Sequence, residues 1–248
     1  MKQITDYLKA HEQRFIDELV EYLRFPSVSA QSVHKKDMTA CARWLANHGK
    51  SIGLKARVHK TDGHPIVTLA TPRKRTGSRP HFLVYGHYDV QPPDPLELWD
   101  TPPFDPQIRG RNLYARGASD NKGQHFAHIK AVEAYLKTGT ELPCDLTFVV
   151  EGEEEVGGEA LVDFLKQKKR DLKCDGVVVS DTGMPDLKHP ALTYALRGVA
   201  ALEVRLDGPD RDLHSGIYGG SVENPAMALS KLLAQMIDKN GRIAVPGF

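Results

Sequence analysis

Short apolar runs separated by helical patterns are the feature that most constrains the fold of this chain. Each run is rich in β-branched or aromatic side chains, as expected of strands buried on both faces of a sheet. The runs occupy residues 66–69, 82–85, 146–150 and 177–179. Amphipathic patterns typical of helices separate the last three runs, at 121–137 and 159–172. Strands that alternate with helices predict the α/β fold class, with a largely parallel central sheet flanked by helices.

Two amphipathic helices are predicted before the first strand. Apolar residues recur at helical spacing over residues 4–24, and Pro26 follows the pattern. A second helical pattern covers residues 37–52, and Gly53 supplies its C-terminal stop.

The sequence pattern changes near residue 190, which predicts a domain boundary there. Residues 191–208 alternate loosely between apolar and polar side chains, as an exposed pair of strands would. Residues 224–239 are predicted to form a helix. We therefore divide the chain into residues 1–189 and 190–248.

Composition excludes several classes of protein. The 248 residues carry 33 basic and 32 acidic side chains, and this balance argues against nucleic-acid or anionic-membrane partners. No apolar run approaches the roughly 18–20 residues of a membrane span, and the charged N-terminal segment lacks the apolar centre of a secretory signal. The three cysteines form no CxxC pair and are interpreted as reduced thiols. These features predict a cytoplasmic protein.

Potential metal ligands follow three of the predicted strands. His87 and Asp89 follow the second run, the acidic segment 151–155 follows the third, and Asp181 follows the fourth. In open α/β sheets, ligands bind beyond the carboxyl ends of the strands. His87 and Asp89 are two residues apart and point to the same side of an extended backbone, so the carboxylate can orient an imidazole that binds metal.

Two acidic positions allow two interpretations each. Asp120 precedes the helix at 121–137 and can be its N-cap, a carboxylate that bridges two cations, or both. The run EGEEE at 151–155 is either a charged helix start or a pair of glutamates that divide metal binding and general-base catalysis. Carboxylates with imidazole suit Zn, Mn or Co, whereas serine-hydrolase and nucleotide-binding motifs are absent from the sequence.

These residues, in this order, resemble the M20 family of metallopeptidases, and most closely its carnosinase-like dipeptidase branch. The matching stretches are VYGHYDVQP (84–92), LYARGASDNKG (113–123), VVEGEEEVGG (149–158), VVVSDTG (177–183), LRG (196–198) and DLHSGIYGG (212–220). The resemblance implies a catalytic metal-binding domain of the zinc-exopeptidase type over residues 1–189. It implies an incomplete α+β, ferredoxin-like lid and dimerisation domain over residues 190–248.

The resemblance also implies a function and a role for each site residue. The implied function is the metal-dependent hydrolysis of the amide bond of dipeptides or short peptides by a homodimer. The implied cofactors are two divalent metal ions, with zinc expected first and manganese or cobalt as alternatives. The implied metal ligands are His87 and Asp181 on one ion, Asp120 as a bridge, and Glu155 on the second ion. The other implied roles are Glu154 as general base, Asp89 as the residue that orients His87, His214 as the stabiliser of the oxyanion, and Arg197 as a substrate-binding residue.

One feature of the family has no counterpart here. The family's second metal also takes a histidine from near the C-terminus, and no remaining histidine of this chain has a matching context; His189 lies in a Lys-His-Pro turn and is a poor substitute. We therefore expect weak or no hydrolysis by this polypeptide alone. The alternatives are an N-acyl-amino-acid deacylase or desuccinylase of the same family, and an inactive fragment that retains part of the binuclear site.

Overall fold

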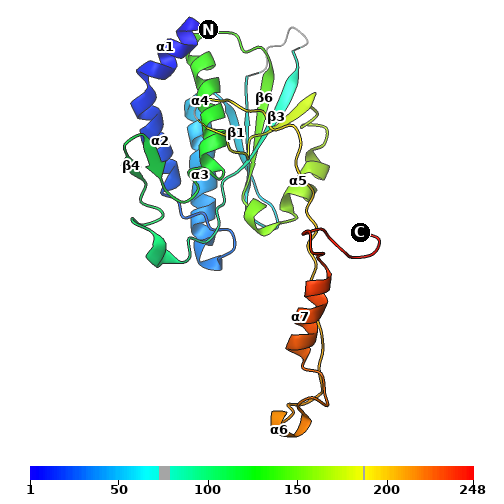
Figure 1. Cartoon of the computed structure of the whole chain (residues 1–248). Coiled ribbons are helices and arrows are strands. Elements are labelled where there is room, and N and C mark those ends of the chain that lie inside the picture. The colour runs from blue at the N-terminus through cyan, green and yellow to red at the C-terminus, as the bar shows by residue number, and fades with distance from the viewer. Residues whose placement is uncertain (73–78, 187) are drawn as a thin grey trace. The chain divides into compact units, whose positions relative to one another are not determined.

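The computed structural model describes residues 1–72, 79–186 and 188–248 as two compact units, Met1–Ala191 and Leu192–Phe248 (Figure 1). The assignment of residues 1–189 to a catalytic domain and of 190–248 to a lid remains a prediction.

A five-stranded sheet forms the centre of the first unit, with the strand order β1-β2-β6-β3-β7. Its strands are β1 (Lys55–His59), β2 (Ile66–Ala70), β3 (His81–His87), β6 (Asp145–Glu151) and β7 (Gly176–Val179). Strand β3 pairs in parallel with β6 and β7, whereas β2 is antiparallel to both β1 and β6. The parallel pairs occur where helices cross between strands: α4 (Lys122–Thr138) joins β3 to β6, and α5 (Ala160–Lys168) joins β6 to β7. The predicted α/β fold class is confirmed, and β1 is a strand that the apolar runs did not reveal.

Helices cover both faces of this sheet (Figure 1). On one face α2 (Glu12–Leu23), α3 (Lys35–Ser51) and α4 enclose the larger hydrophobic core. On the other face Phe164 of α5 packs with Leu83 and Val149. Neighbouring residues of one strand, such as Leu83 and Val84, belong to different cores because side chains alternate across a sheet. Both faces of the central strands are therefore apolar, which is why β2, β3 and β6 have continuous apolar runs. The expected burial is wrong for β7, because this strand lies at the edge of the sheet and its valines are 37–59% exposed.

The N-terminal helical pattern divides into two helices. Helix α1 (Lys2–Ala10) ends at His11, and α2 begins at the next residue. The single helix predicted over residues 4–24 is thus interrupted once. The second predicted helix, over residues 37–52, is α3.

The remaining elements of the first unit are short. They are β4 (Gln107–Arg109), which pairs antiparallel with β5 (Asn112–Tyr114), and the 3-10 turns η1 (Ser32–His34), η2 (Leu96–Leu98) and η3 (Glu154–Val156).

The second unit contains two helices, α6 (Ser215–Tyr218) and α7 (Pro225–Gln235). The Asn224 side chain caps α7 by accepting the backbone N–H of Ala226 at 2.9 Å and of Met227 at 3.3 Å. The strand pair predicted over residues 191–208 is wrong, since these residues form no strand. Most of them are exposed and pair with no neighbouring strand, and alternation alone does not satisfy the backbone donors and acceptors of an isolated strand.

Two sequence-based exclusions can be compared with the structure. Across the described ranges, every helix is too short or too polar to cross a bilayer. The cysteines Cys41, Cys144 and Cys174 are all free thiols.

A buried network of charges connects the helices of the first unit. The Lys130 ammonium on α4 donates to His48 Nε2 at 2.7 Å and to Glu133 Oε2 at 2.9 Å, and it also pairs with Glu18 on α2. Arg14 donates to the second oxygen of Glu133 at 2.6 Å. The side chains of Lys130 and Glu133 are only 5% and 1% exposed. Each buried charge in this network therefore has an opposite charge in contact with it.

We expect the stability of the first unit to fall in mild acid because of His48. Burial, followed by the Lys130 charge, lowers the pKa of His48 to about 4 from its ordinary 6.5. Below about pH 6.5 the unfolded chain binds a proton that the folded chain does not bind, so stability decreases as pH falls from 6.5 towards 4 and is unaffected by His48 above 6.5. The expected loss between about pH 7.5 and pH 5 is about 2 kcal/mol.

Urea unfolding followed by tryptophan fluorescence measures this effect, because the Trp44 ring stacks on His48 with the ring centroids 5.0 Å apart. His48→Gln keeps an acceptor for Lys130 but does not titrate. The variant should lose about 2 kcal/mol less than the parent chain over the same pH interval. Equal losses in the two proteins would contradict the prediction.

Candidate metal centre

The candidate site lies where three neighbouring parallel strands end. His87 is the last residue of β3, Glu154 and Glu155 lie in η3 just after β6, and Asp181 follows β7. Because β6, β3 and β7 run in the same direction, their carboxyl ends meet at one edge of the sheet. Asp120, which precedes α4, reaches the same edge.

The His87 imidazole is the centre around which the acidic side chains gather. Its Nε2 lies 3.1 Å from Asp120 Oδ1, 3.2 Å from Asp181 Oδ2 and 3.9 Å from Glu154 Oε2. Ligand atoms of His87, Asp120 and Glu155 all lie within 4.8 Å of one another. The structure therefore brings together the predicted ligands and the predicted base, although up to 94 residues separate them in the sequence.

Asp89 fixes the orientation of the His87 ring. Nδ1 of His87 donates to the backbone oxygen of Asp89 at 3.0 Å, and the Asp89 carboxylate lies 3.4 Å from the same nitrogen. Both side chains are completely buried. Because Nδ1 is held by Asp89, Nε2 is directed at Asp120 and Asp181. This is the orientation that a metal-binding imidazole needs once Nε2 has released its proton.

The charges at this edge of the sheet suit a cation. Burial opposes protonation of His87, but the hydrogen bond and charge of Asp89, with the charge of Asp181, outweigh it and raise the pKa of His87 to about 9. Burial and neighbouring carboxylates raise the pKa values of Glu154 and Glu155. Carboxylates so close together repel one another unless a positive charge lies among them. One imidazole nitrogen and several carboxylate oxygens form a donor set that fits a hard or borderline divalent ion.

The structure distinguishes between the two interpretations of each acidic segment. The N-cap position of α4 belongs to Asn121, and Asp120 faces His87 rather than the helix amides. The acidic run forms the turn η3, and the next helix begins only at Ala160. Neither segment is therefore a simple charged helix start.

Three polar residues that sequence reasoning missed hold the site together. Asn121 Nδ2 donates to Asp181 Oδ1 at 3.1 Å, Gln91 Nε2 donates to Glu155 Oε2 at 2.8 Å, and Ser29 Oγ donates to Asp89 Oδ2 at 2.7 Å. Asn121 and Gln91 lie within one or two residues of predicted site residues, and this adjacency was the available signal. Ser29 precedes its partner by 60 residues, and nothing local identifies it.

His214 and Arg197 lie in the second unit. His214 is the N-cap residue of α6, where its Nδ1 accepts the backbone N–H of Gly216 at 3.1 Å. Arg197 is exposed and outside regular secondary structure. Their predicted roles towards an oxyanion and a substrate remain predictions.

A second group of possible ligands, Glu18, His48 and Glu133, also has its ligand atoms within 4.8 Å of one another. The Lys130 ammonium contacts all three side chains. A cation already lies among these groups, so this cluster is an ion-pair network rather than a metal site.

Comparison with known proteins agrees with this geometry. The model of peptidase family M20/M25/M40 matches residues 83–243, which include every residue of the candidate metal centre apart from Ser29. The chain belongs to this family.

Several relatives of this M20 chain have names that describe dipeptidases. It is 32% identical over 259 residues to the Cys-Gly metallodipeptidase dug1 of Schizosaccharomyces pombe, covering 100% of this chain and 54% of the relative. It is 33% identical over 260 residues to the Beta-Ala-His dipeptidase of Homo sapiens, covering 100% of this chain and 51% of the relative. The chain spans about half the length of the curated relatives it matches.

Solved structures of the family share the fold. The di-peptidase Dug1p of Saccharomyces cerevisiae matches with a TM-score of 0.78 and 27% identity, over 99% of this chain and 54% of that chain. Human carnosine dipeptidase 1 matches with a TM-score of 0.78 and 28% identity, over 99% and 54% of the two chains. The resemblance to M20 metallopeptidases is thus confirmed.

Proposed function

We propose that this chain is a metallodipeptidase, which cleaves the amide bond of dipeptides or short peptides. The observation that carries the proposal is the convergence of Asp120, Asp181 and Glu154 on Nε2 of His87 at the ends of the parallel strands. The relatives named as Cys-Gly and Beta-Ala-His dipeptidases support the substrate class. The same relatives do not favour the deacylase alternative.

The donor set supports a binuclear site. His87 and Asp181 would hold one ion, Asp120 would bridge, and Glu155 would hold the second ion, with zinc preferred and manganese or cobalt as alternatives. When bound, such ions lower the pKa of a water molecule towards neutrality and polarise the carbonyl of the substrate.

Glu154 is proposed as the group that moves the proton. Its carboxylate lies beside the ligand cluster, 3.9 Å from His87 Nε2, and burial raises its pKa towards the range in which a general base works well. Glu154 would accept a proton at Oε2 and pass it to the leaving amine. His214 is proposed to stabilise the oxyanion, and Arg197 is proposed to bind the substrate carboxylate.

The protein is proposed to act as a homodimer. A cytoplasmic location is also proposed, and the three free cysteines support it.

Zinc affinity tests the proposed site directly. His87→Ala removes the central nitrogen ligand and is expected to weaken Zn²⁺ binding by about 100-fold or more, more than the 10- to 100-fold typical of losing an outer partner of a ligand. Competition with a chromophoric chelator measures the affinity. His189→Ala is the matched control, because His189 is exposed and pairs only with Asp186 among the described residues. Unchanged affinity in His87→Ala would overturn the proposed site.

A substrate panel tests the reaction. The metal-loaded chain, at stoichiometric concentration because we expect weak turnover, is incubated with Cys-Gly, β-Ala-His and Ala-Xaa dipeptides. Acetylated and succinylated amino acids form the second arm. We expect release of amino acids from the dipeptides alone; cleavage confined to the acylated substrates would contradict the proposal.

A further inference from the structure

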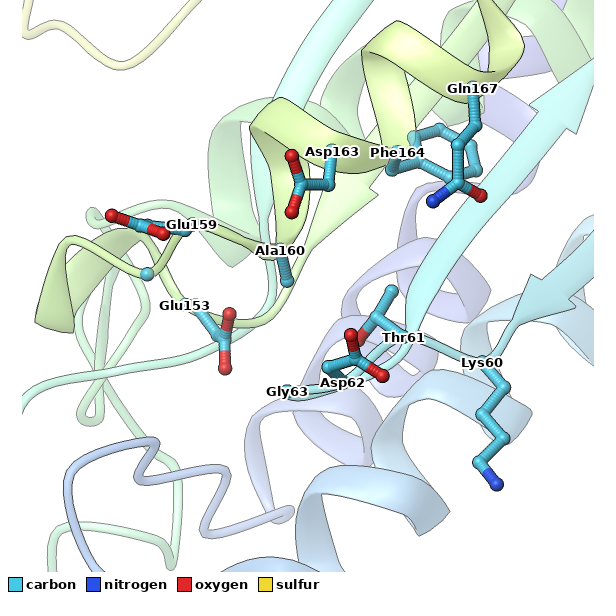
Figure 2. A pocket seen from close by; sticks show the side chains of 11 residues that line it. Lys60, Thr61, Asp62, Gly63, Glu153, Glu159, Ala160, Asp163, Phe164 and Gln167 are labelled. Carbon is cyan, nitrogen blue, oxygen red and sulfur yellow. The ribbon is translucent and has the colours of Figure 1, made fainter.

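The Glu153 carboxylate lies close to the backbone of two glycines, Gly63 and Gly158. A Cβ atom at Gly63 would lie 1.9 Å from Glu153 Oε1, and one at Gly158 would lie 2.4 Å from Oε2. Figure 2 shows the Glu153 side chain beside Gly63. Neither glycine has a positive φ angle, so a side chain added at either position would meet Glu153 without an unfavourable backbone conformation.

The Glu153 carboxylate joins two segments that surround the metal centre. Oε1 accepts the backbone N–H of His64 at 3.0 Å, which ties η3 to the connection between β1 and β2. The His64 ring continues the path, because its Nε2 lies 3.2 Å from the backbone oxygen of Ser29.

The path then returns to η3 and closes. Ser29 Oγ donates to Asp89 Oδ2 at 2.7 Å, and the backbone N–H of Glu155 donates to the same oxygen at 3.1 Å. Glu155 is two residues after Glu153. The side chains of Glu153, Ser29 and Asp89 and the ring of His64 thus form a closed circuit of hydrogen bonds around the turn.

This circuit is important because η3 has few hydrogen bonds of its own. Within the turn, the backbone N–H groups of Val156 and Gly158 donate to the backbone oxygen of Glu153 at 3.3 and 3.0 Å, and that of Gly157 donates to the backbone oxygen of Glu154 at 3.1 Å. A three-residue 3-10 turn has few bonds and poor hydrogen-bond geometry, so its position depends on external contacts. The same turn carries both the proposed general base and one proposed metal ligand.

We propose that Glu153, acting through His64, is a positioning residue that holds η3 and thereby sets Glu154 and Glu155 relative to His87. The proposed effect on catalysis rests on the proposed function. The tether, by which we mean the hydrogen bond from His64 N–H to Glu153 Oε1, does not require a bound metal. An alternative use of Glu153, as a cation ligand with the nearby Asp62 and Asp163 (Figure 2), is not supported because one of its oxygens already accepts from His64.

Two substitutions at Glu153 separate the hydrogen bond from the charge. In Glu153→Gln the amide oxygen can still accept from His64, so zinc affinity and amide exchange should stay within threefold of the parent chain. In Glu153→Ala the acceptor is lost, so amide hydrogen exchange over 153–158 in the metal-free protein should accelerate about tenfold or more. Zinc affinity should fall about 10- to 100-fold, as for other groups that orient metal ligands.

Two further variants keep the test decisive. The methyl group of Gly63→Ala displaces the Glu153 carboxylate without changing its charge, so this variant should have the same effects as Glu153→Ala. It provides an independent test if Glu153→Ala folds poorly. Glu159→Ala is the matched control: Glu159 is exposed and lines one pocket with Glu153 and Gly63, but it lies outside the circuit, so the variant should change neither readout.

The outcomes are distinct. If the parent chain binds no zinc, the proposed function fails. Amide hydrogen exchange in Glu153→Ala then still shows whether the hydrogen bond between Glu153 and His64 holds η3. If the parent chain binds zinc and Glu153→Ala matches it in affinity and in exchange, the positioning role is overturned. Equal losses in Glu153→Gln and Glu153→Ala would also overturn it, because they would make the charge, and not the hydrogen bond to His64, the cause.

Discussion

Replacing Lys130 by methionine is expected to lower the free energy of unfolding of the first unit by about 3–5 kcal/mol. The ammonium contacts Glu18, His48 and Glu133, and the side chains of Lys130 and Glu133 are 5% and 1% exposed. Methionine has a similar length, so the loss arises mainly from carboxylates left with too little positive charge. Arg14 remains on one Glu133 oxygen and cannot replace the contact to the other.

Urea unfolding followed by tryptophan fluorescence measures this loss, since both tryptophans, Trp44 and Trp99, lie in the first unit. Lys137→Met on the exposed side of the same helix is the control and should change stability by less than about 0.5 kcal/mol. The double variant Lys130→Met/Glu133→Gln should be more stable than Lys130→Met, because it removes a buried carboxylate that keeps only Arg14 as its positive partner. A double variant that is less stable would show that the uncompensated charge of Glu133 does not cause the effect.

Glu154→Gln is expected to lower the rate of dipeptide hydrolysis by about 10²- to 10⁴-fold, the usual contribution of a positioned general base. Glutamine has the shape of glutamate but does not accept a proton at neutral pH. Glu154 is the predicted base and not a predicted ligand, so zinc affinity should stay within about threefold.

The rate is measured under single-turnover conditions at saturating zinc, by chromatographic detection of the released amino acid. Glu159→Gln, an exposed glutamate five residues further along, is the control and should retain the parent rate. A Glu154→Gln variant that keeps more than about a tenth of the rate would mean that another group accepts the proton.

The site could be predicted from the sequence to the extent that its residues follow strands. His87, Glu154, Glu155 and Asp181 each come at or shortly after the end of an apolar run, and that position is readable without a structure. The sequence left two interpretations of Asp120, since an acidic residue before a helix commonly caps that helix. The structure excludes the cap, because Asn121 holds the N-cap position of α4, and it places Asp120 against His87, 33 residues away in the sequence. The bridging of two cations by Asp120 remains a prediction.

The errors also have physical causes. Loose alternation over residues 191–208 predicted strands, but a strand forms only where another strand satisfies its backbone, and sequence pattern does not supply that partner. The helix predicted over residues 4–24 has the correct period on both sides of His11, so the interruption leaves the periodicity almost unchanged. Glu153 looked like one more charge of an acidic run, because its partner His64 lies 89 residues earlier.

Local pattern by itself determined the α/β class, the positions of four strands along the chain and the acidic and imidazole side chains at the ends of three of them. These properties depend on burial and on the repeat of the backbone, which neighbouring residues encode. Only the tertiary structure decided that Lys130 contacts three partners on α2, α3 and α4, that Asn121 bonds to Asp181 and Ser29 to Asp89, and that Glu153 bonds to His64. Those contacts join residues far apart in the chain, and their energies exist only after packing has excluded water and fixed the distances between the groups.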